Sequence, residues 1–93
     1  MKTYLVIGAT GQHDSYFEWN VISALDRISA DIFKDKLNKY LIDNKIPRNS
    51  SEECDLYEEN DAVLKNAPDT QLNTNWFNYG IAYRVEAVQL IEN

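Results

Sequence analysis

Cysteine, proline and glycine are scarce in this chain, which has one, two and three of them among its 93 residues. The single cysteine, Cys54, excludes a disulfide within the chain and is typical of proteins that fold in a reducing compartment. No apolar run approaches the ~20 residues that a membrane-spanning helix requires. The apolar segment after Lys2 ends at Gly8, which is too short for the core of a signal peptide. These absences predict a cytoplasmic protein that does not bind membranes.

Histidine is equally scarce, because the chain has only His13, in a polar turn next to Asp14. A zinc site needs several ligands at a regular spacing, and Glu18 is the only further candidate close by. A catalytic nucleophile needs a base and a third group that orients the base, and no such set is present. The sequence therefore predicts a protein that is not an enzyme and has no catalytic, cofactor-binding or metal-binding residues.

Basic residues are absent from one stretch, residues 52–61, which reads EECDLYEEND. The net charge of the chain is −6, from 15 acidic residues and nine Lys or Arg. Six of the acids lie in this stretch, so nine remain to balance the nine bases, and the rest of the chain is neutral. Without a basic face, direct binding to nucleic acid is not expected. A protein partner with a basic surface is expected instead.

The acidic stretch has two interpretations that the sequence leaves open. A solvated loop is the commonest fate of a run of charge. A contact surface is the other, since Leu56 and Tyr57 place apolar anchors among the acids. A calcium loop is not expected, because such loops alternate Asp or Asn ligands around a central glycine that this stretch lacks.

Two strands are predicted in the N-terminal third. Residues 3–7 (TYLVI) are β-branched and aromatic, and apolar on both faces, which predicts a central strand that Gly8 to Gly11 closes. A turn at 12–15 leads to a strand over 17–25, because the short connection favours an antiparallel hairpin. Alternation in this strand predicts one face with Phe17, Trp19, Val21 and Leu25 and another with Glu18, Asn20, Ile22 and Ala24.

A helix is predicted to follow, with Asp26 or Ser29 as its N-cap and its end near Asn44 and Pro47. If Ser29 is the cap, Ile28 and Phe33 occupy the positions of a hydrophobic staple. The buried stripe of the helix is predicted to be Ala30, Phe33, Leu37, Tyr40 and Leu41.

The C-terminal third is predicted to hold a short helix over Asp61–Asn66 and a last strand over Ile81–Ile91, beside the first strand. The apolar residues of this strand change face, so either both faces are covered or a bulge lies near Glu86-Ala87. The predicted fold is a single α+β domain, 1–93, in the order β-β-α-short α-β. An antiparallel sheet of about three strands carries one main helix on one face.

Aromatic residues gather in a turn-rich segment, 69–80, which reads DTQLNTNWFNYG. Its aromatic side chains either fold back on the core or serve as contacts. If these aromatic side chains serve as contacts, they and the acidic stretch together give ten predicted partner-binding residues. They are Glu52, Glu53, Asp55, Tyr57, Glu58, Glu59, Asp61, Trp76, Phe77 and Tyr79.

The segment VIGATGQ, residues 6–12, resembles the opening of dinucleotide-binding domains, especially atypical short-chain dehydrogenases/reductases. In that family the glycines let the backbone approach a pyrophosphate at a helix N-terminus. Here Asp14 stands where the third glycine should be, and a strand-like segment follows instead of a helix. A glycine-bearing hairpin turn is the favoured interpretation. The alternative is a small nucleotide-binding domain that uses Gly8–Gly11 and His13.

The chain as a whole resembles small proteins encoded by bacteriophages and mobile elements. The stretches that carry the resemblance are residues 2–7, 18–21, 26–30 and 83–88. Some small acidic phage proteins inhibit host defence, including anti-CRISPR proteins that occupy the basic nucleic-acid channel of an effector. The resemblance implies a host-cytoplasmic inhibitor that presents the acidic stretch to a CRISPR effector. A further alternative is a structural protein that self-associates through a strand edge or the aromatic segment, for example as a homodimer.

Overall fold

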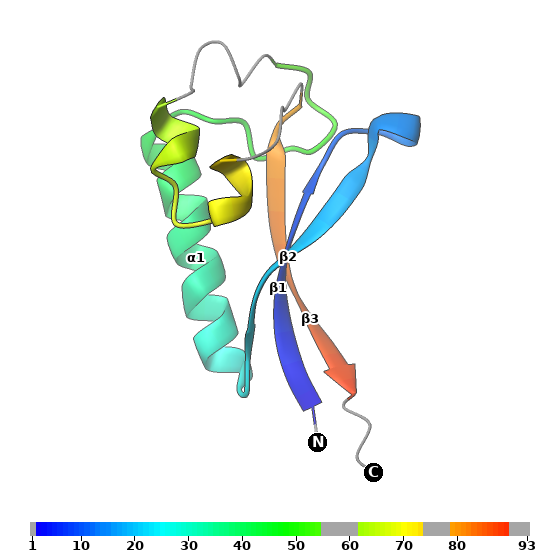
Figure 1. Cartoon of the computed structure of the whole chain (residues 1–93), viewed down its shortest axis with the longest axis vertical. Coiled ribbons are helices and arrows are strands. Elements are labelled where there is room, and N and C mark those ends of the chain that lie inside the picture. Colours follow the sequence, from blue (N-terminus) through cyan, green and yellow to red (C-terminus); the bar gives the residue numbers. More distant parts are fainter. Residues whose placement is uncertain (1, 55–61, 74–78, 90–93) are drawn as a thin grey trace.

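A computed structural model describes residues 2–54, 62–73 and 79–89 of the chain. These residues form a three-stranded antiparallel sheet in the order β2-β1-β3. The strands are β1 (Lys2–Thr10), β2 (Phe17–Ala24) and β3 (Ile81–Gln89). The single long helix, α1 (Arg27–Asp43), packs on one face of the sheet (Figure 1). The predicted α+β fold, with the first strand central and the last strand beside it, is confirmed.

The turn between β1 and β2 is a hairpin connection that contains the 3₁₀ turn η1 (His13–Ser15). Gly11 has φ +89°, a backbone conformation that side chains rarely adopt, and a Cβ there would overlap the Ser15 carbonyl. The Ser15 N–H donates to the Gln12 carbonyl at 3.0 Å. The strand itself runs to Thr10, so Gly8 lies within β1 and only Gly11 serves the turn.

A β-bulge in β2 changes the predicted faces of that strand. Val6 pairs with Ile22 but Ile7 pairs with Asn20, which leaves Val21 as the extra residue. Past the bulge the alternation is shifted, so Ala24 packs against the core cluster around Val6. Leu25, predicted on the same face as Trp19 and Val21, is 79% exposed, whereas those two side chains are half-buried. The assignment of Ala24 and Leu25 to their faces was therefore wrong, because a strict period of two does not survive an inserted residue.

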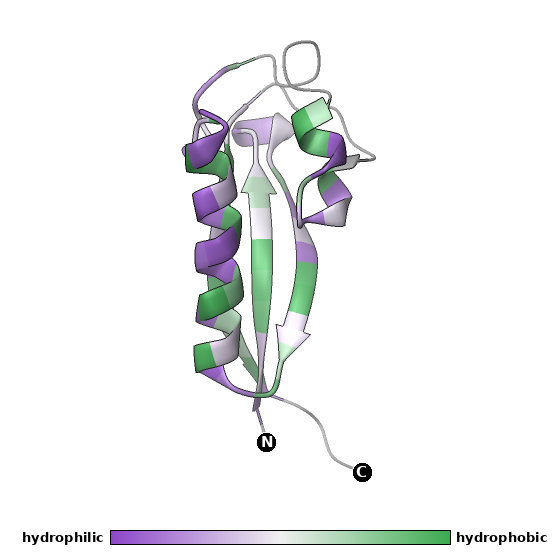
Figure 2. Ribbon diagram, turned by 90° about the vertical axis from the view of Figure 1, so that its left-hand side faces the viewer, coloured by the Kyte–Doolittle hydropathy of each residue, from purple (hydrophilic) through white to green (hydrophobic). Residues whose placement is uncertain are grey.

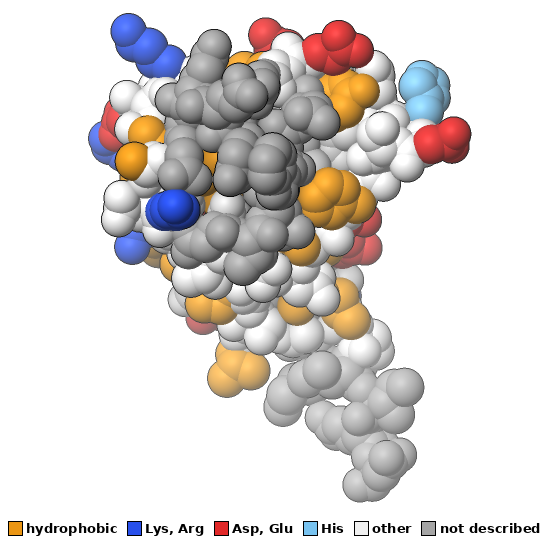
Figure 3. Space-filling view, turned by 45° about the horizontal axis from the view of Figure 1, so that its top comes forward, with side chains coloured by type: hydrophobic (Ala, Val, Ile, Leu, Met, Phe, Trp, Pro, Cys, Tyr) orange, Lys and Arg blue, Asp and Glu red, His pale blue; other side chains and the backbone are white. Residues whose placement is uncertain are grey.

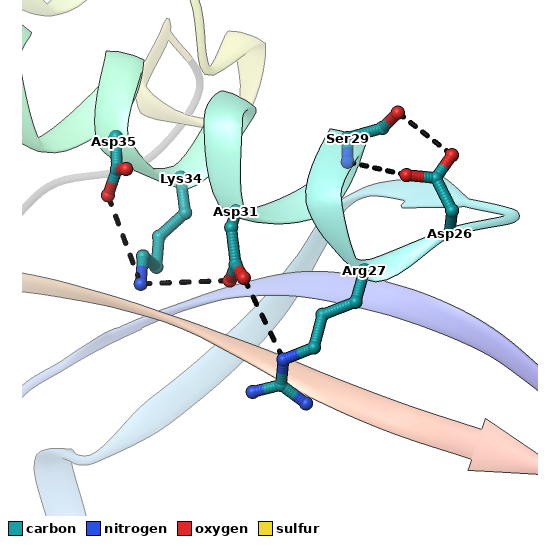
Figure 4. Close-up of polar contacts among 6 residues, drawn as sticks. All are labelled: Asp26, Arg27, Ser29, Asp31, Lys34 and Asp35. Atoms are coloured by element: carbon teal, nitrogen blue, oxygen red, sulfur yellow. Dashed lines mark hydrogen bonds and ion pairs between the residues drawn. The ribbon is translucent and has the colours of Figure 1, made fainter.

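The N-cap of helix α1 is Asp26, one of the two predicted caps. The Asp26 carboxylate accepts hydrogen bonds from the Ser29 backbone N–H at 2.8 Å and from the Ser29 hydroxyl at 2.9 Å (Figure 4). With Asp26 as cap, Ile28 no longer occupies a staple position, and it is exposed. At the other end the predicted Asn44 is the C-cap, and its side chain donates to the Tyr40 carbonyl.

The cap makes part of the domain's stability depend on pH. The hydrogen bonds from the Ser29 backbone and hydroxyl lower the pKa of Asp26. Because the pKa of Asp26 is lower in the folded state, its carboxylate stabilises the fold at pH values above its unfolded pKa of about 3.9. This contribution is lost as the pH falls through the folded pKa. Asp26→Asn keeps a capping side chain that does not titrate. We expect the urea midpoint of the wild type to fall relative to that of Asp26→Asn only under acid conditions. A constant difference across the pH range would contradict this.

The core lies between the inner face of the sheet and α1, and it continues under the connections at one end. Predicted stripe residues Ala30, Leu37 and Leu41 are buried, and Phe33 and Tyr40 pack beside them. Residues 62–65 are helical, as the predicted short helix requires. The buried residues of this core are Val6, Ala30, Leu37, Leu41, Ile46, Leu64, Ala67, Leu72 and Ile81.

The outer face of the sheet is partly covered by its own long side chains. The β1–β3 register is continuous from Lys2–Gln89 to Thr10–Ile81, so β3 has no bulge in this range. Arg84 on β3 forms an ion pair with Glu18 on β2 that spans the central strand. Tyr16 donates to the same Glu18 carboxylate at 2.7 Å. The Arg84 and Tyr16 hydrogen bonds lower the pKa of Glu18. This bridge helps to explain the burial of Ile7 and Ala9 on a face that carries no helix.

Candidate functional site

Three of the ten predicted partner-binding residues lie in the described part of the chain. Glu52 and Glu53 are exposed, and Tyr79 is half-buried. The other seven lie outside the described residues: Asp55, Tyr57, Glu58, Glu59, Asp61, Trp76 and Phe77. The described part of the candidate site therefore consists of the first two acids of the stretch and of Tyr79, which lies two residues before β3.

The segment after α1 fixes the position of Glu52. The Ile81 N–H donates to the Pro47 carbonyl at 2.9 Å, which holds the segment against the start of β3. Asn49 then forms an Asx turn, because its side-chain oxygen accepts from the Ser51 N–H at 3.0 Å and from the Ser51 hydroxyl at 2.8 Å. The Glu52 N–H closes the turn on the Asn49 carbonyl at 3.0 Å. The exposed acids therefore start from an ordered backbone.

The two predicted partner-binding segments meet at this point. The Gly80 N–H donates to the Glu52 carbonyl at 2.8 Å, and Glu53 forms an isolated antiparallel bridge with Tyr79. A Cβ on Gly80 would overlap the Asn49 carbonyl, so glycine permits the close approach. The bridge places an aromatic residue beside the exposed acids. We call Glu52, Glu53 and Tyr79 the acidic end.

A buried threonine ties the acidic end to the central strand. The Thr10 hydroxyl donates to the Gly80 carbonyl at 2.8 Å, and Thr10 is almost fully buried. The connection after α1 runs across this end of the sheet in Figure 1. Figure 3 brings the same end forward and shows acidic side chains mostly over the hairpin side and basic ones mostly over the α1 side. The end is thus electrically uneven, which suits recognition of a charged partner.

A buried carboxylate near the acidic end holds the sheet to the segment before β3. Asp69 is 1% exposed and lies just before the 3₁₀ turn η2 (Thr70–Asn73). Its Oδ2 accepts from the Trp19 indole N–H at 2.8 Å and from the Tyr83 hydroxyl at 2.7 Å. Its Oδ1 accepts from the Gln71 N–H at 3.0 Å. Sequence reasoning missed Asp69, for which the only signal is its place after Pro68 in a turn-forming run.

Tyr83 serves this carboxylate as a hydrogen-bond donor. Burial, and after it the neighbouring charge of Asp69, raise the pKa of Tyr83 far above its ordinary value. The hydroxyl therefore stays protonated over the whole practical pH range, and its proton points to Asp69. This is the arrangement of a structural clamp, in which a neutral hydroxyl donor satisfies a buried carboxylate group.

The glycine motif has no room for a phosphate at Gly8. Gly8 pairs with Trp19 across the hairpin, and a Cβ there would overlap the Trp19 indole. The space that glycine leaves open is thus filled by an aromatic ring. Past Gly11 the chain makes only the short turn η1 before β2, so the segment that directly follows the motif is not a long helix. The nucleotide-binding alternative stays a prediction that this geometry does not support.

The described part of the chain also bears on metal binding and on membrane insertion. Within it, no three or more His, Cys, Asp or Glu side chains are grouped so that they could hold a metal ion. A bilayer-spanning helix, which needs both length and continuous apolarity, does not occur among the described residues. Comparison with known proteins finds no family model, curated protein or solved structure that matches the chain.

Proposed function

We propose that the chain is a non-enzymatic protein-binding domain that engages a basic partner surface through its acidic end. The observation that carries the proposal is the bridge between Glu53 and Tyr79. This bridge joins the acidic stretch to the segment before β3, which the sequence analysis predicts as a contact because of its aromatic side chains. Charge and an aromatic side chain side by side are the usual ingredients of a protein interface.

The charge distribution favours a basic partner. The excess negative charge of the chain comes from residues 52–61, and the rest of the sequence is neutral. A localised field of one sign raises the rate of encounter with a surface of the opposite sign. The backbone hydrogen bonds of Glu52 hold the start of this segment in place, which lowers the ordering cost on binding.

The class of partner that we propose is a nucleic-acid-binding effector of host defence, of the CRISPR type. The support is the resemblance of the sequence to small phage proteins and the chemistry of the surface. Effector channels are lined with Lys and Arg to hold a nucleic-acid backbone. A domain that presents clustered carboxylates can occupy such a channel in place of phosphates.

Charge reversal at the acidic end tests this proposal. Glu52→Lys with Glu53→Lys is expected to weaken binding to an immobilised, guide-loaded CRISPR effector at least about tenfold, because attraction becomes repulsion. Both side chains are exposed, so the fold is retained. Biolayer interferometry over a panel of effector types measures the affinity, and added salt should weaken wild-type binding by screening.

The matched control is Asp31→Lys with Glu86→Lys, which changes the net charge equally but at ion pairs on α1 and β3. If the position of the charges determines the affinity, the control should bind like the wild type. If only net charge determines it, the control should bind like the Glu52→Lys/Glu53→Lys variant. Equal binding by the wild type and by the Glu52/Glu53 variant would exclude the acidic end as the contact surface.

A further inference from the structure

Helix α1 carries a second apolar stripe that the fold does not use. Ile28, Ile32 and Ile42 are 73%, 64% and 53% exposed, whereas Ala30 and Leu37 bury the opposite side of the helix. Figure 2 shows hydrophobic bands recurring along α1. A helix that is apolar on two sides is normally buried on both. The domain alone buries only one of them.

The spacing of the outer stripe is that of a coiled-coil seam. Residues 28, 32, 35, 39 and 42 follow one another at steps of four, three, four and three. These steps place them at successive d and a positions of a heptad, the positions that face a second helix. Isoleucine occupies three of the five, and Asp35 and Lys39 occupy the two in the middle.

The stripe is complementary to itself when two copies run antiparallel. Aligned about the level of residue 37, Ile32 faces Ile42 of the second copy and Asp35 faces Lys39 of the second copy. The two-fold axis repeats both contacts, which gives two isoleucine layers around two ion pairs. In-register parallel pairing would place Asp35 against Asp35 and Lys39 against Lys39, so the charges select the antiparallel arrangement.

Within one copy, the two central charges are held only weakly. The Asp35 carboxylate lies 3.9 Å from the Lys34 ammonium (Figure 4), and its side chain is 75% exposed. Lys39 pairs with Asp43 at 2.7 Å on an exposed surface, where such pairs contribute little. Both groups are therefore available to a facing helix.

We propose that this outer face of α1 is an interface for a second copy of the chain, which pairs antiparallel through Ile32–Ile42 and Asp35–Lys39 contacts. The inference goes beyond the proposed function and uses a different surface from the acidic end. It makes the domain a two-fold dimer in which the helices lie between the two sheets. Each copy keeps its own acidic end, so partner binding becomes bivalent.

Sedimentation velocity over a dilution series of the full chain tests the proposal. The wild type is expected to pass from monomer to dimer as concentration rises. Asp35→Lys and Lys39→Asp each place like charges across the seam, so each should weaken the dimer at least about tenfold. The double variant Asp35→Lys/Lys39→Asp restores opposite charges and should recover the wild-type affinity to within about threefold.

A mixing experiment makes the test specific to these two positions. Asp35→Lys and Lys39→Asp chains, each monomeric alone, should form a mixed dimer because every facing pair is then of opposite charge. Circular dichroism controls for folding, and recovery in the double variant or the mixture shows that the single changes do not act by unfolding. A wild type that stays monomeric at every concentration, or single variants that dimerise like the wild type, would overturn the proposal.

Discussion

Asp69→Ala is expected to destabilise the domain by about 2–6 kcal/mol, because two buried side-chain donors lose their acceptor. The change leaves the Trp19 indole N–H and the Tyr83 hydroxyl without their acceptor in a site that is 1% exposed. Each unsatisfied buried donor costs about 1–3 kcal/mol. A domain of this size has a total stability of only roughly 5–14 kcal/mol. Urea unfolding followed by tryptophan fluorescence measures the loss.

Two further variants separate the carboxylate from its donors. Tyr83→Phe removes one donor and should cost about 1.5–3 kcal/mol, because its hydrogen bond goes to a charged acceptor. In the Tyr83→Phe background Asp69→Ala should cost less than in the wild type, since one donor no longer needs a partner. A loss of less than about 1 kcal/mol for Asp69→Ala alone would show that the clamp does not stabilise the fold.

Leu37→Ala is expected to cost about 2–5 kcal/mol, which is the usual range for a fully buried leucine. Leu37 is 2% exposed and packs against Val6 and Ala30 between α1 and the sheet. Alanine is the better helix former, so the loss reflects packing and the cavity rather than helix propensity.

The matched control is Lys36→Ala, the neighbouring exposed position on the same helix. Its ammonium lies 5.8 Å from the centroid of the Phe33 ring, so the change should lower the free energy of unfolding by less than about 1 kcal/mol. Denaturant unfolding of both variants at one low protein concentration makes the comparison. If Leu37→Ala lowered the free energy of unfolding no more than Lys36→Ala does, this would contradict the packing of α1 on the sheet through Leu37.

The elements of the fold were predictable because local patterns and long-range packing agree. The apolar run of β1 indicates a central strand, and the short connection after it requires an antiparallel neighbour. The stripe through Leu37 and Leu41 indicates which side of α1 meets the sheet. Where the sequence pattern was broken without a local signal, prediction failed. The bulge at Val21 depends on pairing with β1, and no feature of residues 17–25 reveals it.

The candidate site was predictable only in part. Composition indicates the acidic stretch and the aromatic segment, but the contact between Glu53 and Tyr79 depends on how the chain returns to β3. Asp69 was missed because its partners, Trp19 and Tyr83, lie on two strands far away in the sequence. The second stripe of α1 has the spacing of a core face, and only the exposure of Ile28 and Ile32 shows that it is free.

The most direct test of the proposed function is whether the chain competes with nucleic acid for binding to an effector. A guide-loaded CRISPR effector is titrated with labelled target DNA in the presence of the wild-type chain or the Glu52→Lys/Glu53→Lys variant, over the same panel of effector types. We expect the wild type to displace DNA from at least one effector, and we expect charge reversal to abolish the displacement. Unchanged DNA affinity across the panel at saturating wild-type chain, or equal displacement by the variant, would contradict it.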